Sequence, residues 1–317
     1  MKRNVLARQA VAGAALVALA LTGCSSNPAG GNGSGDEKEL SGSVKIDGSS
    51  TVAPLSEAAA ELYSDEQPKV KVGVGTSGTG GGFEKFCAGE TDISDASRPI
   101  KDEEKAACEK AGVEYTELLV ANDALSVVVH KDNDWVDCLT VEQLKKIWGP
   151  DSKVKNWNEI DPKFPNEPLK LYGAGTDSGT FEYFTEEING EKGASRKDYE
   201  ASEDDNVLVT GVAGTKGALG YFGFTYFEEN ADKLKAVKID GGDGCVEPSA
   251  ATAQDGTYKP LSRPLFIYVS KKSVERAEVK DFVKFYVESI DDIVKEARFI
   301  SLTEEQKKTL AGEFGKL

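Results

Sequence analysis

Three short runs of glycine and hydroxyl residues carry the clearest chemistry in this sequence. They lie at residues 48–51, 76–82 and 177–180, each between a strand-like and a helix-like segment. The first turn of a helix presents unpaired backbone N–H groups and a partial positive charge, and a neighbouring Ser or Thr adds a hydroxyl donor. We therefore expect the three runs to form one cradle for an oxyanion.

The segments around these runs alternate between short strands and helices. This pattern predicts α/β lobes with largely parallel or mixed sheets, in which ligands bind beyond the carboxyl ends of strands. Hydrophobic periodicity and turn residues predict strands at 43–46, 70–75, 92–93, 115–120, 124–129, 169–173 and 264–270, and helices at 54–64, 82–87, 102–111, 141–147, 180–188, 207–215 and 279–287.

The length of the chain predicts two lobes. About 275 residues follow the N-terminal region, which is too many for one core. We interpret the apolar segments 124–129 and 265–269 as the outgoing and returning crossings between the lobes. Lobe I is then discontinuous, with residues 42–125 and 266–317, and lobe II comprises residues 126–265.

The N-terminus has the pattern of a secretory signal peptide at residues 1–23. Three basic residues precede an apolar run of about 12 residues, which is too short to span a bilayer. Small residues before Cys24 resemble a bacterial lipobox, so we expect lipid attachment at Cys24; the alternative is a plain secreted protein with a chance cysteine there. Residues 24–41 are rich in Ser, Gly and Asn and predict a flexible tether.

The chain is strongly acidic. Its formal net charge is −16, and removal of residues 1–23 takes away three positive charges and no negative one, which leaves −19. This acidity argues against nucleic acid as a partner. It does not exclude a small anion, because local dipoles and one well-placed cation can outweigh a distant, screened field.

The cysteines and the single histidine limit the chemistry further. Four cysteines follow Cys24, and an oxidising compartment favours two disulfides. Of three pairings we favour Cys87–Cys108, which closes a local loop, and Cys138–Cys245, which joins the ends of the middle region. The alternative is a zinc site, but no C-x-x-C spacing is present and His130 is the only histidine. We expect no metal, no cofactor and no enzymatic activity.

Several motifs in a fixed order resemble the phosphate-binding protein of the bacterial phosphate ABC transporter, the PstS family. The likeness extends from about residue 42 to near the C-terminus. Its motifs are Gly-Ser-Ser-Thr-Val-x-Pro at 48–54, the glycine-rich turn, Asp-Ile-x-x-Ala-Ser-Arg-Pro at 92–99, Leu-Thr-x-x-Gln-Leu at 139–144, Asn-Trp at 156–157, Ser-Gly-Thr at 178–180 and Gly-Ala-Leu-Gly-Tyr at 217–221.

The resemblance implies a two-lobe fold of the periplasmic-binding-protein type (type II) that closes on inorganic phosphate without making or breaking a bond. It also implies delivery of phosphate to the permease subunits of an ABC transporter. We expect a lipid-anchored monomer on the outer face of the cytoplasmic membrane.

The resemblance also implies which residues contact phosphate. Ser50 and Thr51 match the first loop of the family, and Ser178, Gly179 and Thr180 match its Ser-Gly-Thr motif. In the glycine-rich turn, alignment from the following helix favours Thr79, whereas alignment from the preceding strand favours Ser77.

Two positions concern the charge of the site. In some members a carboxylate accepts a hydrogen bond from the protonated phosphate oxygen, and the site rejects sulfate because sulfate carries no such proton. In this chain Asp95 is the nearest carboxylate, but alignment on Pro99 places Ser97 at the position of that carboxylate. Other members have an arginine shortly before Ser-Gly-Thr, where this chain has residues 173–177 without one. Arg98 is the predicted replacement, through charge-assisted contacts.

Three alternatives remain at this point. A serine hydrolase would use Ser178 as nucleophile, but that mechanism needs a histidine base and only His130 is available. A second alternative is a binding protein for sulfate, molybdate or another oxyanion. A third is a surface protein that keeps the fold for sensing or adhesion.

Overall fold

The structure is a computed structural model, and it describes residues 40–317 of the chain. The predicted signal peptide, the predicted lipidation site Cys24 and nearly all of the predicted tether lie outside the described residues. In the described part, none of the helices combines the length and the apolar character that a membrane crossing requires.

The described chain alternates strands and helices along most of its length, as the sequence predicts. The strands are β1 Gly42–Gly48, β2 Val70–Gly75, β3 Ile93–Ala96, β4 Tyr115–His130, β5 Cys138–Thr140, β6 Lys170–Ala174, β7 Glu200–Ser202, β8 Ala218–Gly223, β9 Leu234–Ala236, β10 Lys238–Asp240, β11 Cys245–Val246 and β12 Ser262–Ser270. The α-helices are α1 Ala53–Glu66, α2 Gly78–Cys87, α3 Asp102–Ala111, α4 Val141–Trp148, α5 Trp157–Ile160, α6 Gly179–Phe184, α7 Asp205–Ala213, α8 Phe224–Glu229, α9 Ala250–Gln254, α10 Ala277–Glu288, α11 Ile290–Glu296 and α12 Glu304–Phe314. A π-helical turn, η1 Thr185–Asn189, continues α6, and a 3₁₀ turn, η2 Ser273–Glu275, precedes α10.

Nine strands form one mixed sheet in the order β2-β1-β3-β12-β4-β8-β6-β7, with β9 paired to β4. Strands β1, β2 and β3 are parallel to one another, as are β6, β7 and β8, whereas β12 and β4 run antiparallel to their neighbours. A second sheet has the order β11-β10-β5. The predicted α/β class with mixed sheets is confirmed.

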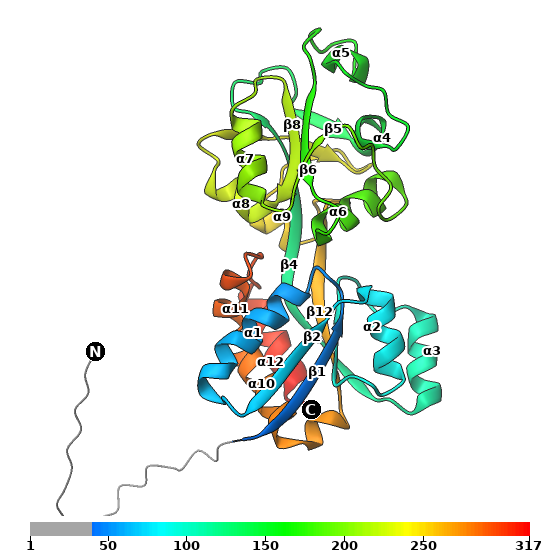
Figure 1. Cartoon of the computed structure of the whole chain (residues 1–317), viewed down its shortest axis with the longest axis vertical. Helices are drawn as coiled ribbons and strands as arrows, with labels where there is room; N and C mark the ends of the chain where they lie inside the picture. Colours follow the sequence, from blue (N-terminus) through cyan, green and yellow to red (C-terminus); the bar gives the residue numbers. More distant parts are fainter. Residues whose placement is uncertain (1–39) are drawn as a thin grey trace, which may run out of the picture. The chain divides into compact units, whose positions relative to one another are not determined.

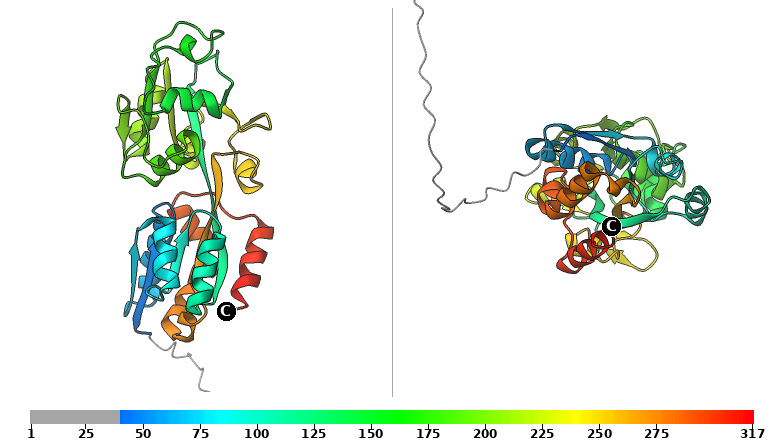
Figure 2. Two further views of the ribbon diagram at one scale, coloured as in Figure 1. Left: turned by 90° about the vertical axis from the view of Figure 1, so that its right-hand side faces the viewer. Right: turned by 90° about the horizontal axis from the view of Figure 1, so that it is seen from below.

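Strands β4 and β12 join the two halves of the large sheet (Figures 1 and 2). The first part of β4 pairs with β12, and its last residues pair with β8. The sequence predicts two separate strands here, at 115–120 and 124–129, whereas the structure has one strand that continues through the polar pair Asn122-Asp123. Both side chains are nearly buried and hydrogen-bonded, to Gln306 and Arg263 respectively, so the polar pair is satisfied without a break in the strand.

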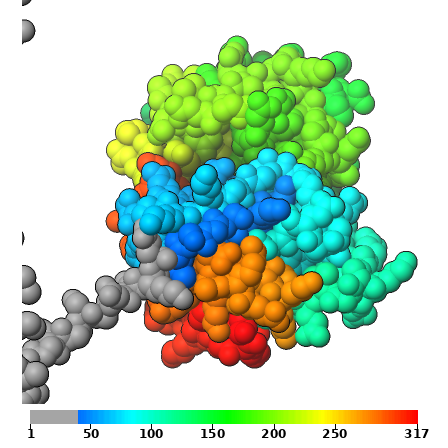
Figure 3. Space-filling model, turned by 60° about the horizontal axis from the view of Figure 1, so that its bottom comes forward, coloured from blue at the N-terminus to red at the C-terminus, as the bar shows by residue number. Residues whose placement is uncertain are grey.

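Each half of the sheet has its own hydrophobic core. The half with β1 packs Val44, Ile46 and the apolar face of α10 into one cluster. The other half packs Trp148 and Trp157 into a separate cluster. In Figure 3 the C-terminal segments (orange and red) lie beside the first strand (blue), so both ends of the described chain belong to the same half.

Both predicted disulfides are present. Cys87 is bonded to Cys108, which ties the end of α2 to α3, and Cys138 is bonded to Cys245, which ties β5 to β11. Neither pair bounds the cavity described below, so we assign both a structural role.

The glycine-rich turn is more helical than the sequence predicts. Helix α2 begins at Gly78 rather than at residue 82, so that Gly80, Gly81 and Gly82 lie within it. A Cβ atom on Gly82 would lie 2.6 Å from the Cα atom of Gly48 and 3.0 Å from the carbonyl oxygen of Asp47. The glycine therefore lets the helix pack closely on the end of β1.

Substitution of Gly48 by alanine tests how strictly the backbone at the end of β1 is constrained. Gly48 has a φ of +151°, and a Cβ atom there would lie 2.1 Å from the carbonyl oxygen of Asp95. We expect Gly48→Ala to lower the free energy of unfolding by more than about 2 kcal/mol, measured by urea denaturation.

The matched control is Gly73→Ala on β2, where a Cβ atom would meet nothing within 4 Å. We expect this variant to change the stability by less than about 1 kcal/mol, because only backbone entropy changes. Equal losses in the two variants would contradict the steric explanation.

Candidate functional site

Four loops at the carboxyl ends of parallel strands converge on one cavity of about 1010 Å³. They follow β1, β2 and β3 in one half of the large sheet and β6 in the other. This is where ligands of open α/β sheets bind. Seven of the ten predicted binding residues line the cavity: Ser50, Thr51, Ser77, Thr79, Ser97, Arg98 and Gly179.

The loop after β1 presents hydroxyl groups at the start of α1. The amide of Ser49 donates to the carbonyl oxygen of Asp95 at 2.9 Å, which fixes the loop against β3. Ser49 Oγ then accepts from the amide of Thr51 at 3.2 Å. Ser50 and Thr51 both face the cavity and are half-buried, as an anion cradle requires.

The loops after β2 and β3 meet through their hydroxyl groups. Thr79 Oγ1 lies 3.1 Å from Ser97 Oγ and accepts from the amide of Ser97 at 3.2 Å. The hydroxyl of Ser77 donates instead to Asp47. Both residues that the glycine-rich turn offers thus line the cavity, but only Thr79 is tied to the neighbouring loop.

The predicted Ser-Gly-Thr loop contributes mainly through its glycine. Ser178 is the N-cap of α6, and its Oγ accepts from the amide of Thr180 at 3.1 Å. Neither of these two residues lines the cavity, whereas Gly179 does. A Cβ atom on Gly179 would lie 2.8 Å from Thr51 Oγ1. The glycine is therefore what allows this loop to approach the loop after β1.

Arg98 lines the cavity but is already paired. Its Nη1 and Nη2 atoms donate to the two carboxylate oxygens of Glu104 at 2.8 and 2.7 Å. A bidentate pair of this kind neutralises much of the guanidinium charge. The predicted role of Arg98 as the cation of the site is weakened by this contact.

Asp95 does not reach the cavity. It is fully buried in β3, and its Oδ1 accepts from Ser56 Oγ of α1 at 2.9 Å. Burial raises the pKa of Asp95 to about 8, against the hydrogen bond from Ser56. Its placement argues against the predicted contact with a ligand, whereas Ser97, the alternative predicted for that contact, lines the cavity.

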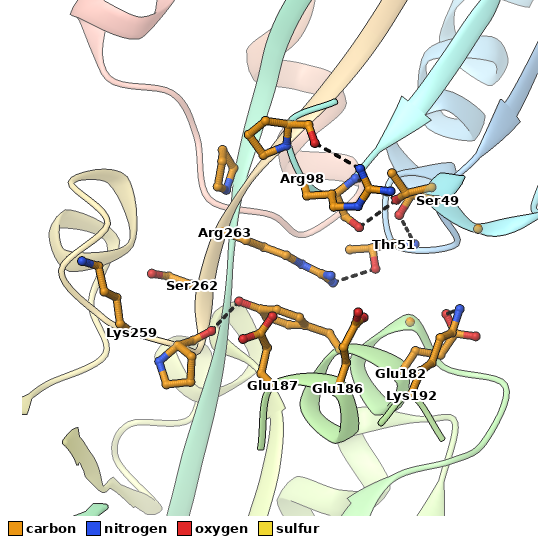
Figure 4. Close-up of a pocket in the computed structure, with 18 of the residues that line it drawn as sticks. Ser49, Thr51, Arg98, Glu182, Glu186, Glu187, Lys192, Lys259, Ser262 and Arg263 are labelled. Atoms are coloured by element: carbon orange, nitrogen blue, oxygen red, sulfur yellow. Dashed lines mark hydrogen bonds and ion pairs between the residues drawn. The ribbon is translucent and has the colours of Figure 1, made fainter. Parts of the chain in front are cut away.

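Arg263 is a cavity residue that the sequence analysis missed. It lies at the start of β12, opposite Asp123 of β4 in the strand register, and its Nε donates to Asp123 Oδ2 at 3.1 Å. Its Nη2 donates to Thr51 Oγ1 at 2.7 Å. Figure 4 shows the side chain pointing between Thr51 on one side and Glu186 and Glu187 on the other. The sequence feature that could have identified Arg263 is its position directly before the returning apolar strand.

Carboxylates line the side of the cavity formed by α6 and η1, a feature that the sequence analysis also missed. Glu182 Oε2 accepts from Ser50 Oγ at 2.9 Å and pairs with Lys192 at 2.8 Å. Glu186 and Glu187 lie on the same side (Figure 4). Burial and the neighbouring Glu186 raise the pKa of Glu187, against the attraction of Arg263. The signal for these acids was the run of Glu residues after Ser-Gly-Thr.

The described residues contain no group of three or more His, Cys, Asp or Glu side chains arranged to hold a metal ion. The cavity is instead bounded by hydroxyl groups, backbone, two arginines and several charged pairs. Such a lining is chemically suited to a small, hydrogen-bonding anion.

Comparisons with known proteins agree with this geometry. A family model described as a PBP superfamily domain matches residues 29–289. The phosphate-binding protein PstS of Staphylococcus saprophyticus is 44% identical over 286 residues, which cover 88% of each chain. The chain belongs to the PstS family.

Two further relatives extend the likeness. Protein SphX of Synechococcus elongatus is 50% identical to this PstS-family chain over 262 residues, which cover 82% of this chain and 77% of that protein. A solved structure of a possible phosphate binding protein from Planctomyces limnophilus superposes with a TM-score of 0.84 at 50% identity, covering 87% of this chain and 99% of that one. The two-lobe fold type that the resemblance implies is thereby confirmed.

The buried Asp95 predicts a dependence of stability on pH. Its pKa is about 8 in the folded protein and 3.8 in a model compound, so the folded state binds the extra proton between these values. Its contribution to stability is full below pH 4 and is lost as the pH rises to about 8.

We compare the free energy of unfolding of Asp95→Asn with that of the unmodified protein. As the pH rises from 5 to 8.5, we expect the difference between them to shift in favour of the variant by at least about 2 kcal/mol. Urea denaturation at several pH values measures this difference. The exposed Asp134→Asn serves as control and should show a constant difference. If the difference in free energy of unfolding for Asp95→Asn were also independent of pH, a buried, protonated carboxyl group at this position would be contradicted.

Proposed function

We propose that this protein captures inorganic phosphate in the cavity and delivers it to an ABC-type phosphate permease. The observation that carries the proposal is the convergence of Ser50, Thr51, Thr79, Ser97 and Gly179 from both halves of the sheet on one cavity. The membership of the PstS family supports phosphate as the ligand, because the relative with 44% identity is a phosphate-binding protein.

Capture follows from the placement of these donors. The hydroxyl groups of Ser50 and Thr51, just before α1, lie in one half, and the Gly179 loop lies in the other. A tetrahedral oxyanion between them accepts hydrogen bonds from both halves, which favours closure around it. We propose that the two halves are lobes with the predicted limits 42–125 plus 266–317 and 126–265, and that β4 and β12 supply the hinge.

We propose binding without catalysis. A serine hydrolase would need His130 beside Ser178, but His130 Nδ1 accepts from the amide of Asp132 at 3.1 Å. Ser178 Oγ is engaged as the helix cap of Thr180. Among residues 40–317, no hydrogen bond links His130 to Ser178. A histidine base that activates the serine nucleophile is therefore not supported by these contacts.

The cellular setting completes the proposal. We propose that the mature protein begins at Cys24, carries a lipid there and remains as a monomer on the outer face of the cytoplasmic membrane. The basic and apolar pattern of residues 1–23 supports export, and the two disulfides support an oxidising compartment.

Calorimetry with phosphate and sulfate tests the ligand. We expect one phosphate per chain at neutral pH and sulfate binding at least about tenfold weaker. Glu186 and Glu187 line the cavity and can accept a hydrogen bond from protonated phosphate, whereas sulfate brings no proton between two negative charges. Absence of phosphate binding would refute the proposed function. Equal binding of sulfate would favour a general oxyanion receptor.

Removal of the Glu182 charge should tighten phosphate binding. Glu182 holds Ser50 and Lys192, both of which a bound anion would otherwise use, and its charge repels the ligand. We expect Glu182→Gln to raise the affinity by a few-fold to about tenfold, measured by calorimetry.

Glu142→Gln is the matched control, because Glu142 also lines the cavity, whereas among residues 40–317 the carboxylate that pairs with both Ser50 and Lys192 is that of Glu182. Its effect should be smaller. A loss of affinity in Glu182→Gln would mean that this carboxylate accepts a hydrogen bond from phosphate rather than competing with it.

A further inference from the structure

We propose that Arg263 is the cation that binds the anion in this protein, in place of the arginine missing before Ser-Gly-Thr. The inference rests on the proposed function and adds to it the residue that supplies fixed positive charge. It follows from how Arg263 is held, which donors it keeps free and how the other cations of the cavity are engaged.

Arg263 is immobilised on three sides. Its Nε donates to Asp123 Oδ2 at 3.1 Å, and its Nη2 donates to Thr51 Oγ1 at 2.7 Å. The guanidinium carbon lies 3.5 Å from the centre of the Tyr183 ring, a stacked cation–π contact. Tyr183 is fixed in turn, because its hydroxyl donates to the carbonyl oxygen of Pro260 at 2.6 Å. A cation held in this way loses little entropy when a ligand binds.

The same contacts leave donors for a ligand. A guanidinium carries five N–H groups, and Asp123 and Thr51 use Nε and one N–H of Nη2. No hydrogen bond joins Nη1 to another residue in the described range 40–317. Arg263 lines the cavity and its side chain is 12% exposed, so the free edge meets the cavity rather than bulk solvent.

The other cations of the cavity are less suited to this role. Arg98 is bound to both oxygens of Glu104, and Lys192 is paired with Glu182. Lys101 and Lys259 line the cavity but are exposed, and a hydrated, flexible ammonium group gives weak and non-directional attraction.

The position of Arg263 also suits a ligand that joins the two halves. Its guanidinium contacts Thr51, which precedes α1, and Tyr183, which lies on α6 one turn after Gly179. These are the same two loops that approach each other at Thr51 and Gly179. An oxyanion bound between the loops therefore meets the planar guanidinium, whose two Nη atoms match two oxygens of a tetrahedral ligand.

Calorimetry with inorganic phosphate on variants of the mature, full-length chain tests the inference. We expect Arg263→Gln to weaken phosphate binding by about 100-fold, the usual effect of losing charged hydrogen bonds. Arg263→Lys keeps the charge but not the fork, and we expect about a tenfold loss. The double variant Arg263→Gln with Asp123→Asn should show the same loss as Arg263→Gln, without leaving Asp123 as an unpaired buried charge.

Arg298→Gln is the matched control. Arg298 is also stacked on a tyrosine, with its guanidinium carbon 5.0 Å from the Tyr226 ring, and is paired with Glu229, but it does not line the cavity. We expect unchanged affinity in this variant.

Two results separate the inference from the proposed function. If the unmodified protein binds phosphate and Arg263→Gln or the double variant binds within twofold of it, the inference is overturned while the proposed function stands. If the unmodified protein does not bind phosphate, the proposed function falls and the inference falls with it. An Arg263→Lys variant with unchanged affinity would overturn the claim that the guanidinium fork is needed.

Discussion

The ion pair between Asp123 and Arg263 joins the two strands that the rest of the structure is built around. Strand β4 runs through both halves of the large sheet and pairs with β12 along its first part, where these two residues face each other in the register. The side chains are 9% and 12% exposed. Burial raises the pKa of Asp123, against the attraction of Arg263. Loss of either partner would leave an uncompensated buried charge, so the pair constrains the chain where the cavity is formed.

The second constraint is electrostatic, since a chain with a formal charge of −16 has to hold an anion. Local structure provides for this in two ways. The hydroxyl groups of Ser50, Thr51 and Ser97 line the cavity, where distant charges are screened. Directly behind the first loop, Asp95 is buried with a pKa of about 8, so that this carboxyl group is largely neutral at pH 7 and adds little repulsion.

The sequence predicted the loops of the site better than its charges. Short strands followed by glycine and hydroxyl residues are local patterns, and Ser50, Thr51 and Gly179 therefore line the cavity as expected. Charge pairing is harder to predict, because a charged side chain can pair with a residue at any distance along the sequence. Arg98 lies six residues before its partner Glu104, whereas Arg263 lies 140 residues from Asp123. The burial of Asp95 likewise depends on a distant contact, because the Ser56 hydroxyl that donates to it lies 39 residues away on α1.

A crystal structure of the protein with bound phosphate is the most direct test of the central claim, that one oxyanion is held between the two halves of the sheet beside a fixed guanidinium. We predict phosphate oxygens within hydrogen-bond distance of the loop after β1, of the Gly179 loop and of Arg263. Phosphate bound to one half alone, or beside Arg98 and Lys101 with Arg263 uninvolved, would contradict the account.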